Sequence, residues 1–168
     1  MAVEHFARCC EYAQETLNTE LAVFGAKNLW NQALPLLTSP TTRASLVHPL
    51  QLATRALVAV HYAEDPLFLL GLFAARFDCL SDSGQWEQVH SMLAEAFPAV
   101  PNAFHRRLWA LRMLALSRQG KDVVVAMGKM KESQARAQAG IWLVLAHASS
   151  KRSDQLEGYS QAIEILQA

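Results

Sequence analysis

The feature that most constrains the fold is a spacing that occurs three times: an aromatic residue stands eleven positions before a small turn residue. The three pairs are Phe73 and Gly84, Trp109 and Gly120, and Trp142 and Ser153. The aromatic residues are 36 and then 33 positions apart. A pattern that recurs every few tens of residues is typical of chains built from stacked repeats. The spacing therefore predicts a stack of similar units, each made of a helix, a turn and a second helix.

Residues 105–130 show the form of this unit most clearly. The first half has apolar residues at helical spacing, namely Trp109, Ala110, Met113, Leu114 and Leu116. Gly120 follows the last apolar turn, where the end of a helix favours a residue that tolerates a positive φ. Asp122 can then cap a second helix, in which Val123, Val124, Met127 and Met130 keep a helical period. The stretch predicts two consecutive helices joined by a glycine turn.

Composition indicates an all-α protein. Apolar residues make up 52% of the 168 residues, which is enough for a core, and the 7 glycines and 6 prolines form no rich tract. There is no Asn-Gly or Asp-Gly hairpin turn and no sustained alternation of apolar and polar residues, so strands are not expected. We expect about nine helices in a single domain over residues 1–168.

The N-terminal half predicts five of these helices. They are expected at Val3–Thr16, at Glu20–Leu37, around Leu50 to Val60, from Pro66 to Ser83, and at Trp86–Phe97. Asp65 followed by Pro66 is a strong start signal, since Asp can cap the helix and Pro suits its first position. The third helix can begin at Pro40 with a kink near Pro49, or begin at Pro49 itself.

The C-terminal third predicts a helix that Ser133 caps and that reaches Ala148, and a last helix from about Asp154. Glu157 stands three residues after Asp154, which suggests a capping box. We assign one stripe of the last helix to the core: Leu156, Tyr159, Ile163 and Leu166. Solenoids normally end in a polar cap, so this apolar stripe leaves two alternatives. The chain is a piece of a longer array, or its end docks on a partner.

The charge is balanced overall but unevenly distributed. Residues 101–140 contain eight Lys or Arg and two acidic residues. A basic face can attract an acidic partner such as a tubulin tail, or RNA, although the same residues can simply solvate the helix surface. Arg106, Arg107 and Arg112 are the candidate partner-binding residues, because arginine grips acidic peptides and carboxylates. The patch can be extended by other arginines, namely Arg43, Arg55, Arg76 and Arg136.

No catalytic, cofactor or metal motif is found. The six histidines lack metal-ligand spacing, and no glycine-rich phosphate loop occurs. Cys79 lies in an apolar helix and is expected to be a core residue, while a catalytic Cys–His pair remains the alternative. The three cysteines form no paired framework, and the first residues do not resemble a signal peptide, which suggests a reducing, cytoplasmic location. The longest apolar run, Pro66 to Ala75, is too short to span a bilayer.

Residues 66–97 and 102–130, and less closely 133–168, resemble tetratricopeptide repeats, which are about 34 residues long. The resemblance implies a right-handed α-solenoid of helical hairpins. The sequence departs from the family where the first helix usually has Leu-Gly: Arg76-Phe77 and Arg112-Met113 stand there instead. Early in the second helix, where the family usually has a small residue, this chain has Val89 or Val125. The peptide-clamp residues of the family are therefore not transferred to this chain.

Two stretches are also similar to the large tetratricopeptide proteins of cilia and flagella. They are NLWNQALPLLTSPTTRASLVHPL (28–50) and IWLVLAHASSKRSDQLEGYSQAIEIL (141–166). This resemblance implies a non-enzymatic scaffold of the axonemal central apparatus, bound to other central-pair proteins or to microtubules.

Together these observations predict a non-catalytic protein–protein interaction scaffold in the cytoplasm, in the cilium or flagellum if the second resemblance holds. Its partners would be other proteins, such as axonemal proteins or tubulin, rather than a membrane, a nucleic acid or a small-molecule substrate. One alternative is a helical adaptor for RNA or for a cytosolic signalling complex; RNA binding would weaken steeply as salt rises. The other is an enzyme on a helical scaffold, which requires a pocket where polar groups converge.

Overall fold

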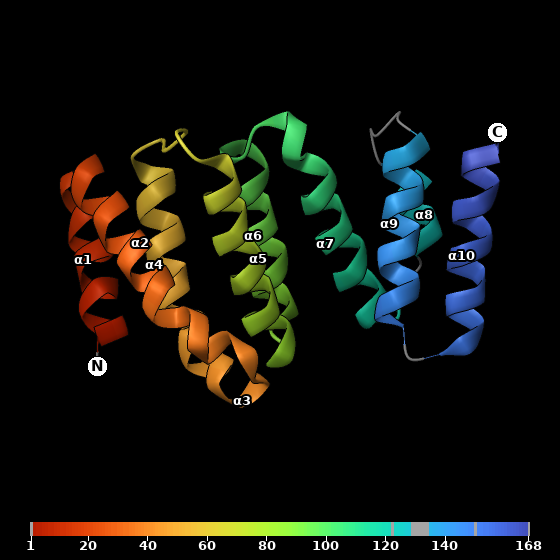
Figure 1. Ribbon diagram of the computed structural model, residues 1–168, viewed down its shortest axis with the longest axis horizontal. Coiled ribbons are helices and arrows are strands. Elements are labelled where there is room, and N and C mark those ends of the chain that lie inside the picture. Colours follow the sequence, from red (N-terminus) through yellow and green to blue (C-terminus); the bar gives the residue numbers. More distant parts are fainter. Residues whose placement is uncertain (1, 122, 129–134, 150, 168) are drawn as a thin grey trace. The chain divides into compact units, whose positions relative to one another are not determined.

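The computed structural model describes residues 2–121, 123–128, 135–149 and 151–167 (Figure 1). Within these ranges the regular structure is helical and there is no strand, which confirms the all-α prediction. The chain forms two compact units, Met1–Asn102 and Ala103–Ala168. A single repeat domain over the whole chain stays a prediction.

The first unit contains six α-helices and two short 3₁₀ helices. In chain order they are α1 (Ala2–Thr16), α2 (Thr19–Ala33), η1 (Leu34–Thr38), α3 (Pro40–Arg43), η2 (Ala44–Leu46), α4 (Val47–Ala59), α5 (Pro66–Asp82) and α6 (Trp86–Ala99). Helix α1 packs on both α2 and α4, and α5 packs on both α4 and α6. Phe73 and Phe77 of α5 are fully buried, as expected for a helix that is apolar on most of its circumference.

Local start and stop signals act as the sequence predicts. The Asp65 carboxylate accepts a hydrogen bond of 2.9 Å from the Phe68 amide, with Pro66 at the first position of α5. Asn18, which was not predicted as a cap, caps α2 in the same way through the Leu21 amide. Gly84 and Gly120 both adopt a positive φ, near +67° and +68°, directly after α5 and α7.

The region between α2 and α4 differs from the prediction. The second helix ends at Ala33, and Pro35 lies in the following 3₁₀ helix instead of inside α2. Both alternatives for the next helix are partly realised. Pro40 begins the short α3, and Pro49 lies in the first turn of α4, which starts at Val47. A proline there removes an amide that would have no acceptor within the helix.

A buried ionic network joins α4, α5 and α6. The Arg76 side chain, 3% exposed, donates from Nη1 to Thr54 Oγ1 and to Glu95 Oε2, both at 3.1 Å. Arg55 Nη2 lies 3.7 Å from the other oxygen of Glu95. Burial lowers the pKa of Arg76, and the bond to Glu95 opposes this change. Arg76 therefore lies in the core, and its predicted place in a surface patch is wrong.

The described residues of the second unit form four α-helices. A 3₁₀ turn, η3 (Asn102–Phe104), lies at the boundary and is followed by α7 (His105–Arg118), α8 (Val123–Gly128), α9 (Ala135–Ala148) and α10 (Arg152–Gln167). The hairpin predicted around Gly120 is confirmed by α7 and α8. Asp122, Met130 and Ser133 lie outside the described residues. The core of this unit includes Met113, Ile141, Trp142, Leu145 and Ala162.

Helix α10 faces α9 with small residues, which corrects the predicted core stripe. Gly158 and Ala162 are buried, and a Cβ added at Gly158 would lie 2.8 Å from Ala146 Cβ and 3.2 Å from the Trp142 carbonyl oxygen. The four residues assigned to the core are exposed instead: Leu156 by 59%, Tyr159 by 36%, Ile163 by 54% and Leu166 by 57%. A helix that approaches its neighbour through glycine leaves no room for large side chains on that face.

The start of α10 also differs from the prediction. The helix begins at Arg152, so Asp154 lies within its first turn and is not the cap. The Asp154 carboxylate accepts hydrogen bonds from Ser149 Oγ and Ser153 Oγ, both at 3.1 Å. The Asp154 carboxylate thus binds two hydroxyls. It also lies in the first turn of α10, where the positive end of the helix dipole stabilises its negative charge.

The close approach of α1 and α2 generates a first testable prediction. A Cβ added at Gly25 would lie 2.9 Å from Cys10 Sγ and 3.2 Å from Cys9 Sγ, whereas a Cβ at Gly71 in α5 meets nothing within 4 Å. Gly25→Ala should lower the free energy of unfolding by about 1–2 kcal/mol, because overpacking exceeds the gain in helix propensity. The control Gly71→Ala should be neutral or stabilise by up to about 1 kcal/mol. Urea unfolding followed by circular dichroism compares them, and equal stabilities would contradict the contact.

The buried network of Arg76, Thr54 and Glu95 generates a second testable prediction. Glu95→Leu leaves the Arg76 charge buried without its carboxylate and should destabilise by roughly 2–3 kcal/mol, less than for a fully buried pair because Glu95 is 31% exposed. Adding Arg76→Met should restore most of the loss, since a buried pair can often be replaced by apolar residues. Unfolding of both variants and of Arg76→Met alone completes a double-mutant cycle. Additive losses would show that the two side chains do not interact.

Candidate partner-binding site

Helix α7 carries the three arginines predicted to bind a partner, and all three are exposed. Successive residues of an α-helix are about 100° apart, so Arg107 lies about 100° from Arg106, and Arg112 lies about 120° from Arg106 on the other side. The helix thus presents Arg106 and Arg107 next to each other and Arg112 in a different direction. Their role in partner binding stays a prediction.

Two of the three arginines contact a neighbouring group that orients them. The guanidinium of Arg106 lies over Gly140 of α9, where an added Cβ would be 3.3 Å from Nη2. The Arg112 guanidinium lies 5.2 Å from the centre of the Trp109 ring, in a cation–π contact. Side chains that are already oriented lose less conformational entropy when they bind, which favours Arg106 and Arg112 as contacts for an acidic partner.

The arginines proposed to extend the patch are mostly paired. Arg43 Nε lies 3.1 Å from Asp82, and Arg55 shares Glu95 with the buried Arg76. Arg136 in α9 is exposed. The first unit therefore holds Arg43, Arg55 and Arg76 in internal ion pairs, and of the four only Arg136 belongs to the second unit with the α7 arginines.

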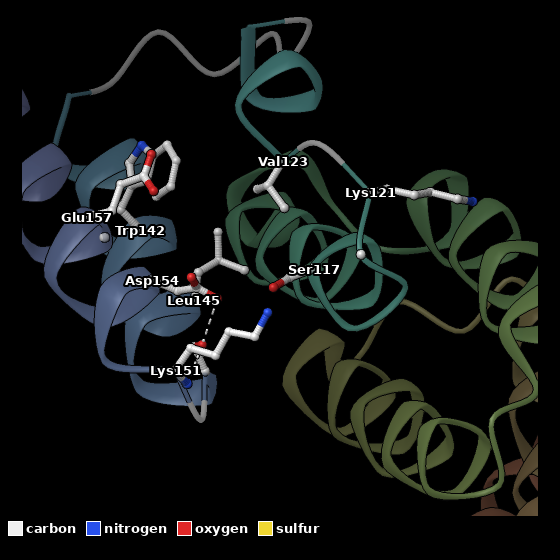
Figure 2. A pocket seen from close by; sticks show the side chains of 11 residues that line it. Ser117, Lys121, Val123, Trp142, Leu145, Lys151, Asp154 and Glu157 are labelled. Carbon is white, nitrogen blue, oxygen red and sulfur yellow. Dashed lines mark hydrogen bonds between the residues drawn. The ribbon is translucent and has the colours of Figure 1, made fainter.

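The second unit also has a pocket that the sequence did not reveal. It has a volume of about 460 Å³ and is lined by Ser117, Gly120, Lys121, Val123, Trp142, Leu145, Ser149, Lys151, Asp154, Glu157 and Gly158. Figure 2 shows the Lys151 side chain extending toward Ser117, while the Lys121 ammonium points away from the cavity. The volume falls within the usual range for ligand pockets, of about 300–1,000 Å³.

The lining of this pocket combines both signs of charge with few free hydroxyls. Ser149 Oγ donates to Asp154 and accepts from the Lys151 amide at 3.1 Å, so this serine is occupied in the start of α10. Among the described residues that line the pocket there is no histidine or cysteine, so none of them places an imidazole base beside Ser117 or Ser149. The arrangement can bind a mixed polar and apolar group, and it lacks the nucleophile–base geometry of an acyl-transfer site.

Cys10 and Cys79 have the environment of core residues. Burial raises the pKa of the Cys10 thiol to about 12 and that of the Cys79 thiol to about 11, with Cys9 and Asp78 adding smaller effects of the same sign. A thiol rather than a thiolate is present at neutral pH, and the thiol is a poor nucleophile. The predicted core position of Cys79 is confirmed, since its side chain is fully buried.

The described ranges contain neither a cluster of metal-ligand side chains nor a membrane-crossing helix. No three His, Cys, Asp or Glu residues gather there in a way that could hold a metal ion. None of the helices in the described part of the chain is long and apolar enough to cross a membrane.

Comparison with known proteins gives one informative similarity. No family model matches the chain. The chain is 32% identical over 167 residues, or 99% of its length, to a protein of Chlamydomonas reinhardtii. That protein is "Cilia- and flagella-associated protein 46". The chain spans about 6% of the length of this relative.

This similarity confirms the predicted resemblance to cilia- and flagella-associated proteins and extends it from two stretches to nearly the whole chain. The tetratricopeptide assignment remains a prediction. Two features of the second unit were not predicted: the pocket, and the exposure of the α10 stripe, which was assigned to the core. The stripe had a usable signal, because Gly158 and Ala162 are four residues apart and mark the face that approaches α9 most closely.

The state of the cysteines gives a third testable prediction. With a pKa of about 11 instead of 9.0, Cys79 should have about 100-fold less thiolate than a free cysteine at neutral pH, and burial should slow its labelling further. In the native chain a maleimide should therefore label Cys9, which is half-buried, well before Cys10 or Cys79. Mass spectrometry of peptides measures each site, and labelling in urea is the control. Rapid native labelling of Cys79 would restore the catalytic alternative.

Proposed function

We propose that this chain is a non-catalytic, protein-binding segment of a scaffold in the ciliary or flagellar axoneme. The observation that carries the proposal is the identity of 32% across 99% of the chain to a cilia- and flagella-associated protein.

The proposed architecture is a right-handed α-solenoid of hairpins, similar to tetratricopeptide repeats and continuous over residues 1–168. Its support is the pairing of helices that follow one another: α5 packs on α6, α7 on α8, and α9 on α10. Glycines at positive φ join the first two pairs. Hairpins that each have an apolar face normally bury it by stacking on neighbouring hairpins.

The proposed contact for a partner is the set of arginines on α7, namely Arg106, Arg107 and Arg112. Guanidinium groups form paired hydrogen bonds with carboxylates, and two of these three are oriented by Gly140 and Trp109. The partner that fits this chemistry is an acidic protein segment, such as a tubulin tail or an acidic stretch of another axonemal protein. Because the charges are exposed, they should accelerate association and confer selectivity more than they contribute to affinity.

The fourth testable prediction is a capture experiment with the full chain and extracts of isolated axonemes. The wild-type chain should retain axonemal proteins, including tubulin. A variant with Arg106→Glu, Arg107→Glu and Arg112→Glu should bind these proteins at least about tenfold more weakly, because attraction to acidic groups is replaced by repulsion. The matched control has Arg8→Glu, Lys27→Glu and Arg152→Glu, which makes the same change of charge at other exposed positions.

Each outcome separates the alternatives. If axonemal proteins bind the α7 variant as strongly as the wild type, the scaffold proposal stands, but the arginines are not the binding site. Binding of RNA that weakens steeply between about 50 and 200 mM salt would instead favour the adaptor alternative. If neither axonemal proteins nor RNA are retained, and a tagged chain does not enter cilia of ciliated cells, the ciliary proposal fails.

A further inference from the structure

The pocket of the second unit is lined by charged groups of both signs. Its described lining comes from the C-terminal end of α7, the start of α8, and the facing sides of α9 and α10. The lysines of this lining are Lys121 and Lys151, and its carboxylates are Asp154 and Glu157. The described lining is therefore neutral overall, and its net charge favours neither an anion nor a cation.

Two of these four charges are not available to a ligand. Asp154 accepts hydrogen bonds from two serine hydroxyls, both at 3.1 Å, and Figure 2 shows the Lys121 ammonium pointing away from the cavity. Lys151 and Glu157 differ, because neither side chain has a hydrogen bond or an ion pair with any described residue. One ammonium and one carboxylate thus remain to meet a ligand.

The two remaining charges lie at different ends of the pocket. The Lys151 side chain extends toward Ser117 in the last turn of α7, whose hydroxyl also has no partner among the described residues (Figure 2). Glu157 instead precedes Gly158, where a Cβ would lie 3.2 Å from the Trp142 carbonyl oxygen of α9. An ammonium and a hydroxyl can both donate to a carboxylate, whereas a carboxylate with an indole in the same wall attracts a cation.

Apolar side chains line the space between these two ends. Leu145 and Trp142 of α9 are 7% and 8% exposed, and Val123 of α8 is half-buried. In the view of Figure 2, Leu145 lies between Lys151 and Glu157. A charged group placed against these apolar side chains would lose water without gaining a partner, so the middle of the pocket favours an aliphatic chain.

The charges of the pocket therefore favour a ligand that carries both signs. A ligand with one charge would pair with one end and leave the charge at the other end desolvated without a partner. We propose that this pocket binds a carboxylate and an ammonium joined by an aliphatic chain, the chemistry of lysine, either free or at the C-terminus of a protein. The carboxylate is held by Lys151 and Ser117. The chain lies against Leu145, and the ammonium is held by Glu157. This proposal is independent of the α7 arginines and of the ciliary location.

The fifth prediction compares three small probes in an NMR titration of the full, ¹⁵N-labelled chain. They are 6-aminohexanoate, which has both charged groups, hexanoate, which has only the carboxylate, and hexylamine, which has only the ammonium. 6-Aminohexanoate should shift the Trp142 indole signal and the amide signals of the pocket lining. It should bind at least about tenfold more tightly than either other probe, because a hydrogen bond between charged groups is worth at least a factor of about ten.

Four variants locate the two ends of the site. Lys151→Met should lower the affinity for 6-aminohexanoate to that for hexylamine, and Glu157→Gln should lower it to that for hexanoate. The matched controls are Lys121→Met, whose ammonium points away from the cavity, and Glu164→Gln, which lies on α10 outside the described lining. Each control should change the affinity by less than about twofold, because solvent screens its charge. All four positions are exposed, and circular dichroism verifies that each variant is folded.

Two further ligands distinguish the source of the charged groups. An acetylated tripeptide that ends in a lysine with a free carboxylate represents a protein C-terminus, and lysine itself represents a free amino acid. The one that binds more tightly identifies the occupant. The same tripeptide with an amidated C-terminus should bind at least about tenfold more weakly than the free acid.

Three results would overturn the proposal. The first is an equal affinity for 6-aminohexanoate and for a probe with one charge. The second is an equal loss of affinity in Lys121→Met and Lys151→Met. The third is the absence of shifts in the signals of the pocket lining at probe concentrations up to about 10 mM, where even a weak specific site would be occupied.

Discussion

The close approach of helices at small residues decides which faces of this protein are buried. At Gly25 the backbone of α2 meets the two cysteines of α1, and at Gly158 the backbone of α10 meets Ala146 and the Trp142 carbonyl of α9. A contact through glycine brings the helix axes together and fills the interface with backbone atoms. Of the large apolar side chains of α10, Ile165 packs against the core, while the four residues of the stripe lie outside this interface. The exposed stripe on α10 is therefore a direct consequence of the way in which α10 packs on α9.

The sequence predicts the elements whose causes are local. Asp65 with Pro66 and the glycines at 84 and 120 each act through their own backbone or one hydrogen bond, so their effects can be predicted without the fold. The predictions that fail concern contacts between residues that are distant in the sequence. The stripe of α10 has a perfect apolar period, but a period identifies an apolar face and does not say which of two faces meets the neighbour.

Arg76 shows the same difficulty for a charged residue. An arginine in an apolar helix is normally expected at the surface, yet a glutamate 19 residues later and a threonine 22 residues earlier supply its partners. Such a network costs desolvation energy and contributes little net stability, but it requires α4, α5 and α6 to keep one register. The pocket could not be predicted either, because its lining comes from the ends of several helices, and the order in which they assemble is not visible in any one of them.

The arginines of α7 and the exposed stripe of α10 differ in what limits their contribution to binding. The arginines of α7 are exposed to solvent, where screening leaves each ion pair worth about 0.2–1 kcal/mol. Each of the four half-exposed stripe residues of α10 can contribute about 1 kcal/mol when covered, so the stripe gives about 4 kcal/mol. That sum is close to the lowest cost of bringing two free molecules together, about 4 kcal/mol. Either surface alone therefore supports weak binding, and strong binding requires that several contacts act together or that the partner is held at high local concentration. The proposed scaffold role would meet that condition, because neighbouring contacts along one long chain would hold each partner in place.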